Sequence, residues 1–305
     1  MLKKISIKQI SRYTMLLFVV FLIYLFPEKE NYTLKTVNKE INYHDIFLMD
    51  ENGYISKTNV PVTSIKKEDL IDELLLLLTI DSKYQDKIPN GFVPVIPKNT
   101  KLIDKKLESN TLILNFNKKL LETTIEYEEK VIESIIYTMT SIDQISNIKI
   151  QIEGNYLTKL PKSGKLLNEI LNREFGINKT YDITDIKDVT KVTIYYLNKT
   201  IENELYYIPV TKYVNSKDDK IKIIIDELTS KISYESNLMS YLNYNAKLLD
   251  YSFNEDVLDL NFNEFLFDNL ENKKVLEEVI YSISYSIMDN YEVSKINFFV
   301  NNKEI

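Results

Sequence analysis

The chain lacks cysteine and tryptophan altogether, and it contains one histidine, His44, and five glycines among 305 residues. The absence of cysteine excludes disulfide bonds and a lipid attached to a cysteine, and it fits a protein exported from a bacterial cell. One imidazole without thiolates cannot form the usual transition-metal site, and no HExxH, CxxC or glycine-rich phosphate-binding pattern is present. We therefore predict neither a metal site nor a bound cofactor, and we expect His44 to be an ordinary surface residue.

A hydrolase nucleophile also lacks support, because no serine stands in a G-x-S-x-G pattern. Paired carboxylates are the remaining enzymatic candidate: Asp72-Glu73 and Asp226-Glu227 occur at equivalent positions, and a glycosidase needs two carboxylates about 5–10 Å apart. Neighbouring helical residues point roughly 100° apart, however, and the helix dipole favours acidic side chains in the early turns. We predict no catalytic residue and no enzyme; a cell-wall (peptidoglycan)-associated enzyme or accessory factor is kept as the alternative.

Basic residues are concentrated at the N-terminus. Lys3, Lys4, Lys8 and Arg12 precede an uninterrupted apolar run over residues 15–26, and the first acidic residue follows that run. A basic segment before an apolar one holds the N-terminus in the cytoplasm and sends the following residues across the membrane.

The apolar run allows two interpretations. Its 12 residues fall short of the roughly 20 that span a bilayer, but counting back to Ile10 brings it near spanning length. No A-x-A-like cleavage site follows it. We predict that residues 1–28 are a cytoplasmic basic tip and an uncleaved signal anchor, which gives a single-pass cell-membrane protein with extracytoplasmic domains. A cleaved signal sequence, and hence a secreted protein, is the alternative.

The exported part is acidic. When the four N-terminal cations are taken from the 38 basic residues, the 45 acidic residues leave a formal charge of −11. Such a field disfavours nucleic acid and anionic wall polymers as partners.

One six-residue sequence occurs twice, as LILNFN in Leu112–Asn117 and as LDLNFN in Leu258–Asn263. Each copy is preceded by a strand motif and a helix motif, and it is followed by an apolar helical pattern and an alternating strand, offset by about 144 to 154 residues. The other paired landmarks are Val60–Thr63 with Ile208–Thr211, Ile71–Leu74 with Ile225–Leu228, Val131–Tyr137 with Val275–Tyr281, and Ile148–Ile152 with Ile296–Val300. Five pairs in one order indicate a duplicated domain.

The duplicated pattern predicts an α+β protein with two tandem copies of a β-β-α-β-β-α-β domain, each a mixed sheet with two helices on one face. We expect a spacer over residues 29–43, the first domain over 44–155, a partly ordered linker over 156–189 and the second domain over 190–305. Alternation places Phe116 and Phe262 in the two cores, and Gly176 is expected to end a helical turn in the linker.

The 22 tyrosines are a possible sign of partner contact. We take the tyrosines of the second domain's first hairpin, together with the linker arginine, as a candidate interaction surface on an exposed aromatic edge. It comprises Tyr195, Tyr196, Tyr206, Tyr207 and Arg173. Tyrosine also suits half-buried strands, so these rings could instead fill the core and its rim. A small-ligand-sensing module is a further alternative.

The order of these motifs carries a family resemblance. It runs through Ile208–Thr211, Ile225–Leu228, Val257–Phe262, Leu276–Tyr281 and the strand from Lys295, and more weakly through Thr111–Phe116 and Ile148–Ile150. Together with the linker over residues 172–178, the pattern resembles the sporulation and spore germination (GerM) domain of spore-forming Firmicutes, in its two-copy form.

The resemblance implies a membrane-tethered, non-enzymatic protein that acts outside the cytoplasm in spore formation or germination. Related folds are ring-building modules of envelope channels, so protein–protein assembly is the implied activity, with envelope or sporulation proteins, ring-forming channel components among them, as partners. Contact with peptidoglycan is a further expectation, and no nucleic acid is expected. The lipid-modified cysteine common in two-copy members is absent, so the N-terminal helix would have to provide the membrane contact.

Overall fold

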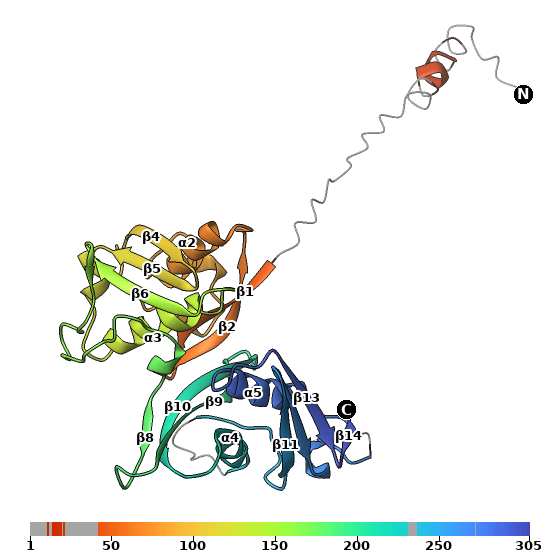
Figure 1. Cartoon of the computed structure of the whole chain (residues 1–305). Coiled ribbons are helices and arrows are strands. Elements are labelled where there is room, and N and C mark those ends of the chain that lie inside the picture. The colour runs from red at the N-terminus through yellow and green to blue at the C-terminus, as the bar shows by residue number, and fades with distance from the viewer. Residues whose placement is uncertain (1–10, 12–13, 20, 22–41, 231–236, 272) are drawn as a thin grey trace, which may run out of the picture. The chain divides into compact units, whose positions relative to one another are not determined.

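The computed structural model describes residue 11, residues 14–19, residue 21 and residues 42–230, 237–271 and 273–305 (Figure 1). The chain divides into two compact units, Met1–Glu40 and Ile41–Ile305. Most of the expected signal anchor and spacer lies outside the described residues, and those that are described before residue 22 are helical. Within the described part of the chain, no helix has both the length and the apolar character needed to cross a membrane.

The second unit begins with the first repeat, which we take as residues 42–156. Its long elements follow one another as strand, strand, helix, strand, strand, helix and strand, with two short strands and two 3-10 turns added. They are β1 (Asn42–Asp50), β2 (Ile55–Val62), α2 (Lys67–Leu77), η1 (Gln85–Lys87), β3 (Phe92–Val93), β4 (Leu102–Glu108), β5 (Thr111–Phe116), η2 (Lys118–Leu121), α3 (Glu128–Met139), β6 (Asn147–Ile152) and β7 (Asn155–Tyr156).

The second repeat, residues 189–304, has the same order of long elements. A linker precedes it that contains a 3-10 turn, η3 (Arg173–Phe175), and a short strand, β8 (Thr180–Asp182). The repeat comprises β9 (Val189–Lys199), β10 (Leu205–Asn215), α4 (Lys220–Thr229), β11 (Leu248–Asn254), β12 (Val257–Phe262), η5 (Glu264–Leu266), α5 (Glu277–Met288), β13 (Lys295–Val300) and β14 (Lys303–Glu304).

The strands of each repeat are divided between two sheets, so the expectation of one mixed sheet per domain is wrong. The later strands of each repeat form a separate four-stranded sheet, with the order β4-β5-β6-β7 in the first repeat and β11-β12-β13-β14 in the second. The pairs β5–β6 and β12–β13 are parallel. Parallel neighbours need a long crossover connection, which α3 and α5 supply. Figure 1 shows α5 between the long strands β9 and β10 and the sheet that contains β11 and β13.

The two first hairpins join into a single six-stranded sheet. Its order is β3-β1-β2-β10-β8, and β9 pairs with β10 on the other side. Strands β2 and β10 come from different repeats and meet through the pair Lys57 and Tyr207. The joint between the repeats is therefore a shared sheet as well as a linker.

Alternating apolar residues build the cores as expected. Phe116 and Phe262, at the ends of β5 and β12, are 1% and 0% exposed. Alternate residues of both strands are buried, as expected when one face of a strand is turned to the core, and β12 buries Asn261 as well.

The last helix of the second repeat begins later than the sequence pairing predicted. Val275 and Leu276 precede α5, which starts at Glu277. Equivalent positions of α3 and α5 are identified by their hydroxyl contacts to the first strand of each repeat. Thr138 of α3 accepts a hydrogen bond from the Phe47 amide at 3.0 Å, and Ser286 of α5 accepts one from the Tyr195 amide at 2.8 Å. The apolar period alone cannot distinguish positions one helical turn apart.

Candidate interaction site at the joint between the repeats

The tyrosines of the candidate surface lie on the paired strands β9 and β10. Tyr195, Tyr196 and Tyr206 are 1%, 3% and 6% exposed, and Tyr207 is half-buried. Three of the four rings are therefore interior, and an exposed aromatic edge is not what they form. Their surroundings show that they hold the molecule together.

Arg173 of the linker touches both repeats. Its guanidinium lies 5.0 Å from the ring centre of Tyr137 and 5.7 Å from that of Phe47, both in the first repeat. It also forms an ion pair with Asp289, the C-cap of α5, whose other oxygen accepts a 2.8 Å hydrogen bond from the Tyr195 hydroxyl. Burial lowers the pKa of Arg173, but the Asp289 carboxylate, together with Tyr195 and Tyr137, holds that pKa above its usual value. The pair fixes the linker against both crossover helices.

The side chain of Asn178 connects the two hairpins where their backbones do not bond. Its Nδ2 donates to the carbonyl oxygens of Ile55 on β2 and Pro209 on β10, each at 2.8 Å, and its Oδ1 accepts from the Ile55 amide at 2.9 Å. Proline has no N–H and cannot donate to a ladder. The amide therefore supplies the bonds that strand pairing lacks at this position.

The linker is also close to the sheet at Gly176. Its φ is 78°, and a Cβ at this position would lie 3.1 Å from the side chain of Thr211 on β10. The Ile177 amide donates to the Thr211 hydroxyl at 2.9 Å. The expected turn-ending glycine is thus required both by its conformation and by the tight approach.

A half-buried aromatic cluster lies beside the joint and was not predicted from the sequence. The ring of Tyr285 lies 5.2 Å from that of Tyr207 and 5.7 Å from that of Tyr281, which is 45% exposed. The Lys57 ammonium lies 4.5 Å from the Tyr285 ring centre and pairs with Asp45 at 2.6 Å. The four-residue spacing of Tyr281 and Tyr285 on one helix was the available signal.

Electrostatics in this cluster reflect burial more than any reactive arrangement. Burial lowers the pKa of Lys57, and the Asp45 carboxylate opposes that shift. Burial also raises the pKa of Tyr285 to about 12. The cluster borders a cavity of about 220 Å³ that Thr200 and Glu204 also line. An aromatic face with a cation suits contact with a protein surface.

The repeated carboxylate pairs do not converge on a shared site. Glu73 is 2% exposed and accepts from the Thr63 and Ser64 amides at 3.0 and 2.9 Å and from Lys87 at 2.6 Å. Glu227 instead accepts from Lys212 at 2.6 Å and from the Tyr196 hydroxyl at 3.2 Å. Each carboxylate joins its helix to the preceding hairpin, which is a structural contact.

The remaining sequence expectations concern metal and histidine. His44 is half-buried, and its Nδ1 lies 2.9 Å from the Asp45 carbonyl oxygen. Among the described residues, no group of three or more histidine or acidic side chains is arranged to hold a metal ion.

Comparison with known proteins agrees with this architecture of two fused repeats. The family model for Germane, described as sporulation and spore germination, matches residues 45–158 and 193–305. The chain belongs to this family, and it carries two copies of its domain.

Individual relatives give the same result. The chain is 29% identical over 271 residues to the spore germination protein GerM of Bacillus subtilis (strain 168), covering 85% of this chain and 71% of that protein. The solved tandem GerMN domains of the Bacillus subtilis sporulation protein GerM are 26% identical, with a TM-score of 0.78 over 86% of this chain and 92% of theirs. The first GerMN domain alone is 26% identical and covers 44% of this chain, with a TM-score of 0.41. The similarity supports a role in sporulation or germination.

Proposed function

We propose that the chain is a non-enzymatic, membrane-tethered protein that acts outside the cytoplasm in spore formation or germination through protein–protein assembly in the spore envelope. The observation that carries the proposal is the family match to both repeats together with the similarity to the Bacillus subtilis germination protein.

The use of charged groups supports assembly over catalysis. In the described residues, Glu73, Glu227 and the buried Arg173 are engaged in contacts within the fold. The exposed features are instead of the kind that bind proteins: the aromatic cluster with Tyr281, and the edge of β11 that pairs with no described strand. Partners would be other envelope or sporulation proteins, including ring-forming channel components, and peptidoglycan contact is compatible with this location.

Tethering is proposed from the sequence. Four cations precede an apolar run, and no cysteine is available for a lipid. Fractionation of sporulating cells tests it. The full chain should sediment with membranes and stay with them after a high-salt wash. A variant in which a cleavable secretory signal replaces residues 1–28 should be found in the soluble fraction. Recovery of both forms in the soluble fraction would contradict tethering.

Deletion in the native host tests the role. We expect normal vegetative growth, with fewer heat-resistant spores or with spores that fail to germinate, and recovery when the full chain is restored. Normal spores and normal germination after deletion would overturn the proposed function. A defect in growth or cell shape would instead indicate a general envelope role.

A further inference from the structure

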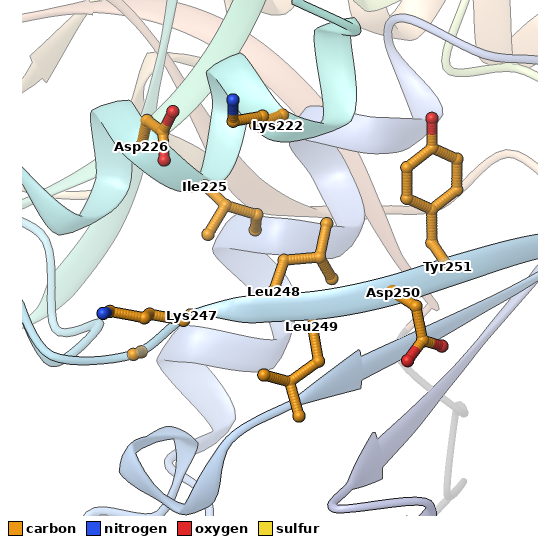
Figure 2. A pocket seen from close by; sticks show the side chains of 9 residues that line it. Lys222, Ile225, Asp226, Lys247, Leu248, Leu249, Asp250 and Tyr251 are labelled. Atoms are coloured by element: carbon orange, nitrogen blue, oxygen red, sulfur yellow. The ribbon is translucent and has the colours of Figure 1, made fainter.

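The second repeat has an open groove between α4 and the edge strand β11. The groove has a volume of about 560 Å³ and is lined by both elements. Figure 2 shows Ile225 of α4 pointing toward Leu248 of β11, with Lys222 and Asp226 on the same helix and Tyr251 extending from β11 on the helix side of the strand. One edge of β11 pairs with β12, and the other edge pairs with no described strand.

The first repeat fills the equivalent place with a lysine of its own. The two edge strands have the same register and the same bulge, so Lys105, opposite Leu114, corresponds to Tyr251, opposite Leu260. Lys105 reaches across to α2, where it forms an ion pair with Asp72 and donates to the Glu68 carbonyl oxygen at 2.5 Å. A strand-to-helix ion pair therefore closes this gap in the first repeat.

The second repeat keeps the acidic half of that pair and has lost the basic half. Asp226 stands where Asp72 stands, within the shared Ile-Asp-Glu-Leu motif, but a tyrosine replaces the lysine. The neighbouring Lys222 pairs with Asp218 at 3.0 Å, and no described residue forms an ion pair or hydrogen bond with the Asp226 carboxylate. Burial and the nearby carboxylates raise the pKa of Asp226, against the charge of Lys222.

The two edges also differ in how they resist pairing with another chain. Strand β4 carries Lys105 and Lys106, and charged side chains protect an edge from association. Strand β11 exposes apolar side chains instead: Leu249, Tyr251 and Phe253 are 50%, 37% and 44% exposed. An edge strand without lysine, beside a groove that Ile225 and Leu248 line, suits the addition of an extended segment.

We propose that the groove between α4 and β11 binds an extended segment of a partner protein that presents a lysine between apolar residues, and that this lysine pairs with Asp226 as Lys105 pairs with Asp72. The segment lies along the free edge of β11, its backbone bonds to the strand, and the apolar side chains on the same face as its lysine cover Leu248 and Tyr251. The inference rests on the proposed function in one respect, which is that the ligand is a protein.

Peptide binding to the full-length chain in detergent tests the proposal. The probe is a fluorescein-labelled peptide, Ser-Thr-Val-Thr-Lys-Thr-Val-Thr-Ser, which is compared with the same peptide carrying norleucine in place of lysine. By fluorescence anisotropy we expect the lysine peptide to bind about fivefold more tightly, which is the size of effect expected from one partly exposed ion pair. Asp226→Asn should abolish the difference between the peptides.

Two further variants make the result specific. The matched control Asp72→Asn, at the equivalent position that Lys105 already occupies, should leave peptide binding unchanged. Tyr251→Lys restores the lysine of the first repeat and should block binding of both peptides. Equal affinity for the two peptides, or binding of neither, would overturn the proposal. So would a dimer of the full chain that Tyr251→Lys converts to monomer, because the occupant would then be a second copy.

Spore assays separate this proposal from the proposed function. Hosts carrying Tyr251→Lys or Asp226→Asn are compared with the deletion. If the deletion reduces spore yield or germination while both variants behave as wild type and no peptide discrimination is found, the groove proposal fails and the function stands. If the deletion has no phenotype but the lysine peptide binds selectively, the function fails and the groove chemistry stands.

Discussion

The side-chain amide of Asn178 donates a 2.8 Å hydrogen bond to the carbonyl oxygen of Pro209 while it also bonds both backbone groups of Ile55. Ile55 and Pro209 belong to different repeats, so one linker residue completes the sheet between them. The asparagine adopts a φ of 45°, a left-handed conformation that asparagine tolerates better than most residues.

Replacement of this asparagine should weaken the joint. Asn178→Ala removes three hydrogen bonds and leaves the Ile55 amide without its partner, which we expect to cost about 2–4 kcal/mol in the free energy of unfolding. Chemical denaturation should then resolve two transitions in place of one. Asn178→Gly relieves the backbone strain but not the lost bonds, so it should cost nearly as much. A single transition of wild-type midpoint in both variants would contradict the assigned role.

The ion pair of Arg173 should be equally sensitive. Asp289→Ala leaves the guanidinium between two rings without its carboxylate, and breaking a buried pair costs roughly 3–5 kcal/mol. Because the Arg173 side chain is 28% exposed, we expect about 3 kcal/mol by denaturant titration. The nearby exposed Glu292→Ala should change stability by less than about 0.5 kcal/mol. Equal losses of stability in the two variants would show that the ion pair between Arg173 and Asp289 does not stabilise the joint between the repeats.

Acid should destabilise the first repeat through Glu73. Although burial raises its pKa, hydrogen bonds from Lys87, Ser64 and Thr63 outweigh this effect and lower the pKa to about 2 from 4.5. A lowered folded-state pKa stabilises the protein above pH 4.5, and that contribution disappears as the pH falls from 4.5 toward 2. It amounts to something on the order of 3 kcal/mol.

Comparison of Glu73→Gln with the wild type measures this contribution. The variant should be less stable at pH 7, and its deficit should shrink as the pH is lowered toward 2. Glu227→Gln, the matched control in the second repeat, removes a more exposed carboxylate and should cost less. A deficit that stays constant from pH 7 to pH 2 would show that ionisation of Glu73 contributes nothing.

The phenylalanines of the repeated motif should be equivalent in the two cores. Phe116→Ala and Phe262→Ala each remove a fully buried ring, which we expect to cost about 3–5 kcal/mol. That is a large share of the roughly 5–15 kcal/mol that stabilises a domain. The exposed Tyr156→Ala is the control and should be close to wild type in thermal melting. Unchanged melting of both phenylalanine variants would contradict the core assignment.

Some of this structure follows from the sequence alone. The repeated LxLxF pattern identified the core strands, because alternation states which side of a strand is buried. The order of paired landmarks identified the duplication, and the family resemblance that followed from it is confirmed by the match to both repeats. Gly176 was recognisable as a turn residue because few other residues tolerate its conformation.

Other features were decided only by the tertiary structure. Alternation shows that a face is buried but does not state what covers it, so the separation of β4–β7 and β11–β14 from the shared sheet could not be predicted. The same limit applies to Tyr195 and Arg173, whose partners Asp289 and Tyr137 lie far away in sequence. These residues were predicted as a surface for another protein. In the folded chain Tyr195 bonds to Asp289 within its own repeat, and Arg173 contacts Tyr137 of the first repeat. Contact between such distant segments depends on the path of the whole backbone and not on any local pattern.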